Sequence, residues 1–490
     1  MSFSDKVSKA REAFNSGKTK PLSFREQQLK ALLRMYEENI DEIVKVVHSD
    51  LGKSRHETLV SEVNIAINDL RDIIMNFKDW AKPMNPSKAL ANTFDGLKIY
   101  SDPYGVALVI SAWNYPLQLC LVPVAGAIAA GNCVVIKPSE LAPETAKFVA
   151  ETVPKYLDDE CVSVVCGGAA ETSQLLRERF DFIFFTGSTA VGRIVHRAAN
   201  EHLTPLVLEL GGKSPVYVDG SVNMEVAARR LIWGKFLNAG QTCIAPDYLL
   251  CTKEVQDRFI TIAKRVLREF YGDDVRSSRD FGRIVNDSHF DRLLGLLRSG
   301  DVAIGGQTDP KERYVAPTVL INVKADDAVM QEEIFGPILP IVLVRDADEA
   351  IDFVNKREKP LSLYVFSSQK RIVDAFLSRT SSGTVCVNDT VLQFATENVP
   401  FGGVGASGMG NYHGKYTFDS FSHKKTCLIR NYNPIGEFLG TGRYPPSSEF
   451  KTQFLASLVK KRDFKFLWYS LWAVLIGCVG AYLKIYKIQY

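Results

Sequence analysis

The sequence lacks the motifs that mark zinc enzymes, disulfide-rich secreted domains and nucleic-acid-binding proteins. Its seven histidines never fall at HExxH spacing, so we expect no metal site. Its nine cysteines include no CxxC pair, which is typical of a reduced intracellular protein. A net charge of only +3 favours no nucleic-acid partner, and the polar stretch 1–20 predicts no signal peptide.

Alternating strand and helix signals run through the chain from Val106 onward. With 490 residues, 46% of them hydrophobic, the chain is long enough for two or three domains. Helical stretches separate short apolar runs that predict strands at 106–111, 133–137, 162–166, 182–186 and 206–210. This alternation predicts an α/β fold with a parallel, doubly wound sheet, followed by a second α/β series over 214–388. Residues 1–82 predict amphipathic helices, one of them over 28–47.

One cysteine and one glutamate stand in settings that favour covalent catalysis. Cys243 closes a polar turn that contains a glycine and follows an apolar, helix-like run. Glu209 lies in an apolar, strand-like run, and burial there would raise its carboxyl pKa toward the range of a general base. A thiolate attacks a carbonyl carbon without a relay of the serine type. Taken alone, however, most cysteines in such settings are small buried apolar side chains.

Two strand ends carry residues that suit a dinucleotide. Thr186, Gly187 and Ser188 end a strand and open a helix, where backbone N–H groups can face a phosphate. The GxxxxG spacing differs from the Rossmann GxGxxG pattern, so a purely structural turn explains this motif equally well. Lys137 and Glu140 follow a neighbouring strand, where they could hold ribose hydroxyls or form a solvated loop.

Two further motifs add polar and aromatic side chains. Trp113 and Asn114 follow a strand, and an Asn amide at such a position can donate to a developing oxyanion. The alternative is a turn residue before Tyr115 and the proline that follows it. Glu333 and Phe335 precede a Gly-Pro turn, where charge is usually solvated.

The C-terminal region contains a run long enough to cross a bilayer. The segment 466–483 holds 18 residues without a charge, between aromatic and basic flanks. The alternative is a buried core helix, but the preceding basic residues and the short tail predict a tail anchor with a cytosolic N-terminal side. Before this run, Phe450, Phe454 and Leu458 recur at helical spacing. They predict an amphipathic helix that lies on lipid or covers a substrate entrance.

Taken together, the motifs resemble the aldehyde dehydrogenase superfamily. WNYP, IKPSE, FTGSTAVG, LELGGKSP, the GQTC cysteine, EEIFGP and PFGGVGASGMG follow one another in that family's order and spacing. The resemblance covers about Lys6 to Tyr444, and seven ordered motifs are far more specific than any one of them. The short N-terminal region and the C-terminal apolar segment resemble the class 3 branch, and within it the membrane-anchored enzymes that oxidise fatty aldehydes.

The resemblance implies a role for each matching residue. Cys243 would attack the aldehyde carbon, while Asn114 and the backbone N–H of Cys243 would stabilise the oxyanion. Hydride would pass to NAD, and Glu209 would then activate water to hydrolyse the thioester. An acid at Glu140 favours NAD through the ribose 2′-OH, although class 3 members can accept NADP. The implied cofactor-binding residues are Trp113, Lys137, Glu140, Thr186, Gly187, Ser188, Glu333 and Phe335.

The resemblance also implies a domain plan. The expected parts are a Rossmann-type NAD(P)-binding domain (1–82 and 103–212), an α/β catalytic domain (213–392), a small bridging β-extension (83–102 and 393–444), a linker with an amphipathic helix (445–463) and a transmembrane anchor (464–483). We therefore expect a homodimer that is tail-anchored in the lipid bilayer of the endoplasmic reticulum, with its catalytic domain in the cytosol. Its expected substrates are medium- and long-chain fatty aldehydes; the alternative is a broad preference for aromatic or medium-chain aldehydes.

Two other function classes remain open at this stage. A cysteine hydrolase would need a histidine beside Cys243, and His196 and His202 are the nearest in sequence. A serine hydrolase is disfavoured, because the stretch 405–409 misses the GxSxG pattern at its last position. An inactive membrane scaffold would have no need of an intact cysteine, glutamate and asparagine in these motifs.

Overall fold

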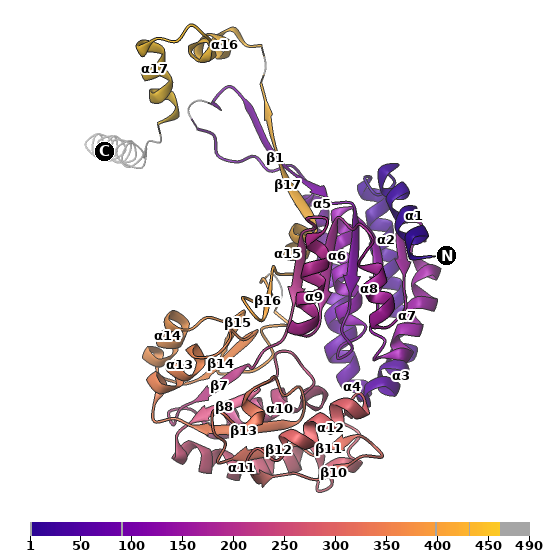
Figure 1. Cartoon of the computed structure of the whole chain (residues 1–490), viewed down its shortest axis with the longest axis vertical. Helices are drawn as coiled ribbons and strands as arrows, with labels where there is room; N and C mark the ends of the chain where they lie inside the picture. Colours follow the sequence, from indigo (N-terminus) through magenta and orange to yellow (C-terminus); the bar gives the residue numbers. More distant parts are fainter. Residues whose placement is uncertain (1, 90–91, 397–398, 431, 461–490) are drawn as a thin grey trace, which may run out of the picture. The chain divides into compact units, whose positions relative to one another are not determined.

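The structure, a computed structural model, describes residues 2–89, 92–396, 399–430 and 432–460 (Figure 1). It comprises two compact units. The larger unit contains the chain up to Lys82 together with Ser101–His423, and the smaller contains Pro83–Tyr100 and the chain from Lys424 onward. Within the larger unit, two hydrophobic cores form around two separate sheets.

A six-stranded sheet organises the first half of the larger unit. Its strand order is β16-β6-β5-β2-β3-β4, and every neighbouring pair is parallel except β16 with β6. The strands are β2 (Val106–Ile110), β3 (Cys133–Lys137), β4 (Val162–Val164), β5 (Phe182–Thr186), β6 (Leu206–Glu209) and β16 (Gly408–Met409). The five predicted parallel strands are confirmed, each within two residues at its end, because apolar runs of this kind are buried on both faces of the sheet.

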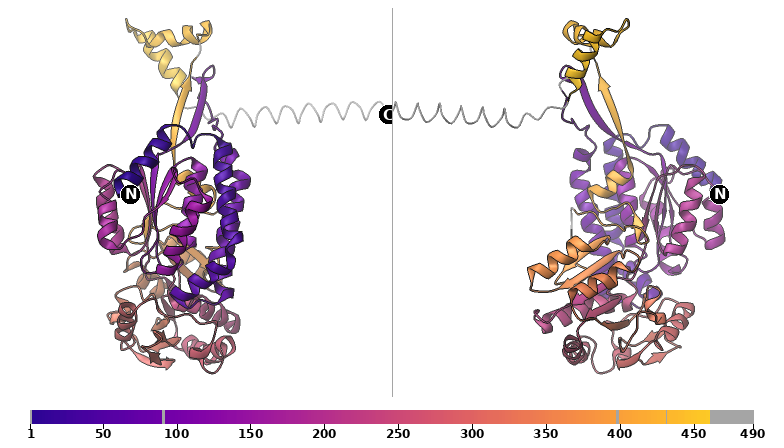
Figure 2. Two further views of the ribbon diagram at one scale, coloured as in Figure 1. Left: turned by 90° about the vertical axis from the view of Figure 1, so that its right-hand side faces the viewer. Right: turned by 60° about the vertical axis from the view of Figure 1, so that its left-hand side comes forward.

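Helices lie on either side of this sheet (Figure 2). They are α1 (Phe3–Asn15), α6 (Gln118–Ala130), α7 (Pro143–Tyr156), α8 (Ala169–Leu175) and α9 (Thr189–Asn200), with α15 (Lys415–Ser420) packed on α6. Every residue of α6 is buried, because neighbouring helices cover the side that faces away from the sheet.

The N-terminal helices pack around α6. They are α2 (Leu22–Glu38), α3 (Ile40–Leu51), α4 (Arg55–Thr58), the π-helical turn η1 (Leu59–Val63) and α5 (Asn64–Trp80). The single helix predicted over 28–47 is wrong, because the chain turns at Asn39 between α2 and α3. Asn39 has non-helical angles (φ −119°, ψ 21°), and its side-chain Nδ2 donates to the Met35 carbonyl at 2.8 Å.

A seven-stranded sheet organises the second half of the larger unit. Its order is β15-β14-β7-β8-β13-β12-β9, with only β9 antiparallel to its neighbour. These strands are β7 (Pro215–Val218), β8 (Tyr248–Cys251), β9 (Asp301–Ile304), β12 (Thr318–Ile321), β13 (Ile338–Leu343), β14 (Ser362–Phe366) and β15 (Thr384–Val387); β10 (Thr308–Asp309) and β11 (Tyr314–Val315) pair separately. Its helices are α10 (Met224–Phe236), α11 (Lys253–Tyr271), α12 (Asp287–Leu296), α13 (Ala347–Asn355) and α14 (Lys370–Arg379), and short turns are η3 (Leu237–Gly240), η4 (Val275–Ser277) and η5 (Ala328–Met330).

In its described residues, the smaller unit contains a two-stranded ribbon and two α-helices. Strand β1 (Gly96–Pro103) pairs with β17 (Ser422–Ile429), and α16 (Pro434–Gly440), η6 (Thr441–Arg443) and α17 (Glu449–Val459) follow. Helix α17 forms where a helix was predicted, and Ser448 caps it by accepting from the Lys451 N–H at 3.3 Å. The predicted anchor at 464–483 lies outside the described residues; none of the described helices combines the length and apolar character that a membrane span needs.

Candidate active site

The turn before Cys243 contains three consecutive residues with left-handed backbone angles, and the last of them is a glycine. In η3, Asn238 and Ala239 both take left-handed angles, with φ of 51° and 52°. Gly240 follows at φ +77°, and a Cβ there would lie 2.2 Å from the carbonyl oxygen of Gly336. Such consecutive left-handed residues cost free energy and persist where surrounding contacts hold them, which is common at functional sites.

Asn114 lies against this turn. Its side-chain Nδ2 donates to the carbonyl of Gln241 at 3.1 Å, and Nδ2 of Asn238 donates to the Asn114 carbonyl at 2.8 Å. One residue along, the Tyr115 hydroxyl is 2.7 Å from Oγ1 of Thr242. Hydrogen bonds from two successive residues therefore fix the predicted oxyanion amide beside the predicted nucleophile.

Glu209 is buried at the end of β6 and is only 3% exposed. Neither of its carboxylate oxygens has a hydrogen-bond partner among the described residues. Burial raises the pKa of this carboxyl well above its usual range. An unpartnered buried carboxyl of this kind is able to hold and release a proton, as a general base must.

The charges around Cys243 show which groups share the site. The thiol is partly exposed, and burial raises its pKa, with the negative charges of Glu333 and then Glu209 raising it further. Burial, followed by the charge of Asp247, raises the pKa of Glu333 to about 8. The structure thus brings one thiol and two carboxyls into electrostatic range of each other.

The segment around Glu333 is held close to a glycine turn. A Cβ on Gly211 would lie 2.0 Å from the Glu333 carboxylate, so only glycine allows this approach. Phe335 has a left-handed φ of 48°, and its ring meets the ring of Trp113 edge to face at 5.3 Å. The His289 ring also meets the Trp113 ring edge to face, with 5.1 Å between the ring centres. Trp113, Phe335 and His289 therefore form one cluster of rings.

The remaining predicted residues gather at strand ends of the first sheet. Lys137, at the end of β3, is 4% exposed and forms an ion pair with Glu140. Thr186 ends β5, and its buried Oγ1 has no partner among the described residues. Ser188 caps α9 by accepting from the Val191 N–H at 3.3 Å, and Gly187 precedes it. The edge therefore offers a cation, a free hydroxyl and a helix N-terminus.

Several residues at the site are missed by the sequence motifs. Arg292 donates to the carbonyls of Glu333 at 3.2 Å and Ile334 at 2.6 Å, while Asp247 accepts from the Ile334 N–H at 3.0 Å. Lys235 is fully buried near these groups, and burial lowers its pKa to about 8. Only the position of Lys235 in the apolar run before the GQTC turn could have marked it.

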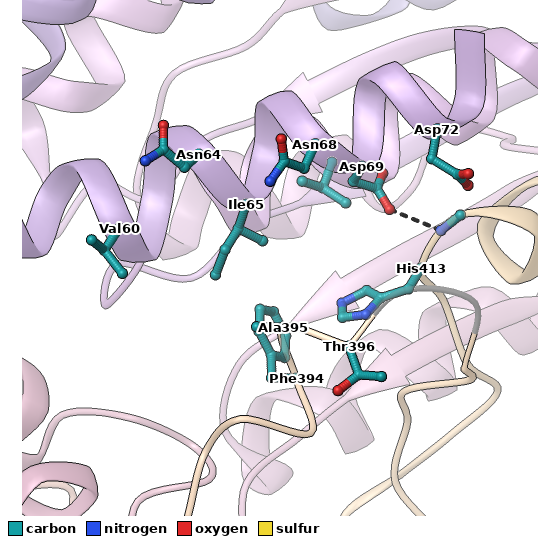
Figure 3. A pocket seen from close by; sticks show the side chains of 12 residues that line it. Val60, Asn64, Ile65, Asn68, Asp69, Asp72, Phe394, Ala395, Thr396 and His413 are labelled. Carbon is teal, nitrogen blue, oxygen red and sulfur yellow. Dashed lines mark hydrogen bonds between the residues drawn. The ribbon is translucent and has the colours of Figure 1, made fainter. Parts of the chain in front are cut away.

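A pocket of about 150 Å³ opens between the α5 side of the unit and the segments 394–396 and 413–414 (Figure 3). It is lined by the apolar or aromatic side chains of Val60, Ile65, Val122, Phe394 and Ala395 and by the polar side chains of Asn64, Asn68, Asp69, Asp72, Thr396 and His413. The His413 ring stacks on Phe401 and meets Phe394 edge to face at 4.6 Å. Tyr412, the next residue, is close enough to Glu209 and Cys243 for their charges to raise its phenol pKa further, after burial. His413, which lines the pocket, therefore directly follows a residue that lies within electrostatic range of Glu209 and Cys243.

A model of the aldehyde dehydrogenase family matches residues 2–427. This chain belongs to the aldehyde dehydrogenase family. Rat aldehyde dehydrogenase family 3 member B1 is 50% identical over 461 residues, which cover 94% of this chain and 98% of the relative. The rat dimeric NADP-preferring aldehyde dehydrogenase is 50% identical over 446 residues, covering 91% and 98%. The substrate-bound structure of Staphylococcus aureus AldH superimposes with a TM-score of 0.90 at 42% identity, covering 93% and 99%.

Membership in class 3 of this family makes the chain an enzyme that oxidises aldehydes with NAD or NADP. The predicted family resemblance and the expected cofactor are confirmed. The site of this aldehyde dehydrogenase fits a dinucleotide: Lys137 with Glu140 suits a ribose, and the unpartnered Thr186 hydroxyl stands just before the α9 N-terminus.

The hydrolase alternatives lack support in the geometry of the described residues. After burial, the charges that raise the pKa of Cys243 are those of Glu333 and Glu209. Ser407 is fully buried and bonds back to its own turn, where it accepts from the Val404 N–H and donates to the Val404 carbonyl, both at 2.9 Å. His196 lies on α9, where it lines a surface groove together with Arg193; Cys243 is not among the residues that line this groove. This aldehyde dehydrogenase therefore has one candidate nucleophile in its motifs, Cys243.

Proposed function

We propose that this aldehyde dehydrogenase converts medium- and long-chain aliphatic aldehydes to carboxylic acids through a thioester on Cys243. The observation that carries the chemistry is the grouping of a thiol, an amide donor and an unpartnered buried carboxyl. The substrate class is supported by the pocket of mixed lining, in which Val60, Ile65 and Phe394 offer apolar surface beside polar side chains (Figure 3).

In the acylation half-reaction, the Cys243 thiol gives its proton to solvent, its sulfur forms a bond to the aldehyde carbon, and the π pair of the carbonyl bond moves onto the oxygen. Negative charge then develops on the aldehyde oxygen, and the Asn114 amide stabilises it. One N–H of that amide donates to Gln241, and an amide has a second N–H for the oxyanion. The nicotinamide, when bound, supplies the hydride acceptor that turns the thiohemiacetal into a thioester.

In the deacylation half-reaction, Glu209 removes a proton from water. The water oxygen attacks the thioester carbon, the carbon–sulfur bond breaks, and the Cys243 sulfur leaves as the carboxylic acid forms. Burial raises the pKa of Glu209. The carboxylate form that can act as a base therefore becomes populated at a higher pH than for an exposed glutamate. Deacylation is therefore the step that depends most on this carboxyl.

Both dinucleotides are proposed as cofactors. Glu140 offers an acceptor for a ribose 2′-OH, which favours NAD, while the ammonium of Lys137 offers a partner for a 2′-phosphate. The rat relative described as NADP-preferring supports this second use.

We also propose a homodimer that is tail-anchored in the endoplasmic reticulum membrane with its catalytic unit in the cytosol. The dimeric rat relative and the exposed apolar side chains of the smaller unit, Tyr432, Ile435 and Phe438, support self-association. The uncharged sequence 466–483 supports the anchor.

Ending the chain after Asp463 is expected to release an active enzyme from membranes, because the only span-length apolar run is lost. Carbonate-washed membranes from expressing cells would be assayed for the full and the shortened chain. Retention of the shortened chain in the pellet would show that another part of the protein anchors it.

The fatty-chain preference is tested on helix α17. Phe450 is 78% exposed and stacks with Phe454 at 6.4 Å, while Phe454 and Leu458 are half-buried and η6 packs against the helix. We propose that the face formed by these three side chains binds the alkyl chains of long aldehydes. Replacing Phe450, Phe454 and Leu458 with serine in the anchor-free chain should lower kcat/KM for hexadecanal but not for hexanal, because each buried methylene contributes about 0.8 kcal/mol.

The matched control replaces Thr452 and Ala456, two exposed residues on the opposite side of α17, with serine in the same anchor-free chain. Both chains would be assayed by NADH absorbance in one detergent. An equal loss with both aldehydes, or no loss, would leave the helix without a role in substrate selection.

A further inference from the structure

Lys53 is a buried cation that contacts the catalytic region from the N-terminal helices. Its side chain has 0% exposure, and its Nζ donates to the Glu62 carboxylate at 2.9 Å and to the Asn114 carbonyl at 2.7 Å. The ammonium also stands 3.8 Å from the centre of the Tyr115 ring. An ammonium has three N–H groups, and these three contacts use all of them.

Glu62 holds this ammonium in place from the π-helical turn η1. Its second oxygen accepts from the N–H groups of Leu117 at 3.0 Å and Gln118 at 3.3 Å, at the start of α6. The turn is closed by a bond from the Asn64 N–H to the Leu59 carbonyl, five residues apart. A π-turn of this kind is rare and is frequent at functional sites.

The same N-terminal segment also holds the nucleophile turn. Glu57, five residues before Glu62, accepts from the backbone N–H of Asn238 at 2.7 Å. Asn238 in turn donates to the Asn114 carbonyl, the atom that also accepts from Lys53. The Asn114 carbonyl is therefore the shared point at which the N-terminal helices, the oxyanion residue and the Cys243 turn meet.

Stability alone is a poor reason for this arrangement. Replacing a buried ion pair with well-packed neutral side chains is often neutral or stabilising, because both charges lose their hydration on burial. The contacts of Lys53 nevertheless converge on Asn114 and on Tyr115, whose hydroxyl bonds Thr242 beside Cys243. We infer that Lys53 is a positioning residue that fixes the Asn114 amide relative to the Cys243 sulfur. This inference rests on the proposed oxyanion role of Asn114.

The test is a double-mutant cycle between Lys53 and Asn114. In the otherwise intact chain, the paired exchange Lys53→Met with Glu62→Gln removes both charges and keeps an acceptor for the α6 N–H groups. We expect kcat for decanal to fall about 10- to 100-fold, because a displacement near 1 Å costs that much. KM and NAD binding by fluorescence titration should change little. In an Asn114→Ala background, the same pair of substitutions should lower kcat by less than about threefold, because the amide that Lys53 positions is no longer present.

The matched control is Arg25→Met. Arg25 is also a buried cation of the N-terminal helices, but it donates to the carbonyls of Ala129 and Ala130 at the far end of α6. This change should lower the melting temperature and leave kcat of the folded enzyme within about twofold. A role of Lys53 in stability alone would reproduce the control, with lower melting temperature and unchanged kcat.

Two outcomes distinguish the positioning role of Lys53 from the oxyanion role of Asn114. Equal losses of kcat from the Lys53 pair with and without Asn114 would overturn the positioning role alone. Unchanged kcat in Asn114→Ala by itself would overturn the oxyanion role, and the inference with it. If the Lys53 pair does not fold, Tyr115→Leu takes its place, because it removes the ring under the ammonium and the hydroxyl bonded to Thr242. A loss that shrinks in the Asn114→Ala background supports the inference, and an equal loss overturns it.

Discussion

Replacing Cys243 with alanine is expected to abolish aldehyde oxidation, with kcat falling by more than about 10⁴-fold, as with other covalent nucleophiles. The loss should be this large because the thiol forms the bond on which both half-reactions depend. NAD binding should be nearly unchanged, because the residues that fit the cofactor are at strand ends β3 and β5. Decanal oxidation and a fluorescence titration of NAD measure the two quantities separately.

The control for this variant is Cys166→Ala, which removes an exposed thiol. It should retain wild-type turnover and so exclude a general effect of losing one cysteine. Appreciable turnover in Cys243→Ala would mean that another group attacks the aldehyde.

Replacing Glu209 with glutamine is expected to separate the two half-reactions. The amide keeps the size of the side chain but cannot accept the proton of water, so turnover should fall by about 10²- to 10⁴-fold. Acylation should still proceed once, which predicts a burst of NADH followed by slow turnover in rapid-mixing fluorescence. Steady-state rates equal to wild type would remove Glu209 from the deacylation step.

The rate of deacylation is expected to depend on pH in a definite direction. Burial raises the pKa of Glu209, so the carboxyl is protonated below that pKa and becomes a base above it. Deacylation by the wild-type enzyme should therefore rise with pH through this pKa, while the slow phase of Glu209→Gln should lose that rise. Glu201→Gln, a surface change at the end of α9, is the matched control and should keep the wild-type profile.

The strands were the most predictable part of the fold. The runs that became β3 and β5 could be bounded from the sequence, because their apolar residues are continuous and both faces are buried. The helices were harder where one amphipathic pattern spans two elements. Asn39 breaks the pattern predicted over 28–47 through its own backbone angles and a bond to Met35, and periodicity alone carries no sign of that break.

Some residues of the candidate site could be predicted from the sequence, and others could not. Motif residues such as Asn114 and Glu209 could be named from short strings, because their chemistry depends on neighbours along the chain. Lys53 could not, because its contact with Asn114 spans 61 positions in the sequence and depends on a π-turn that has no motif. The left-handed backbone at Asn238 is likewise fixed by tertiary contacts rather than by residue type.

The most direct test of covalent catalysis is to look for the thioester itself. Glu209→Gln would be mixed with NAD and decanal, quenched in acid, digested and examined by mass spectrometry. The proposed mechanism predicts a decanoyl group on the peptide that contains Cys243, formed only when both NAD and aldehyde are present. An unmodified Cys243 peptide after a full NADH burst, or acylation of a different cysteine, would contradict it.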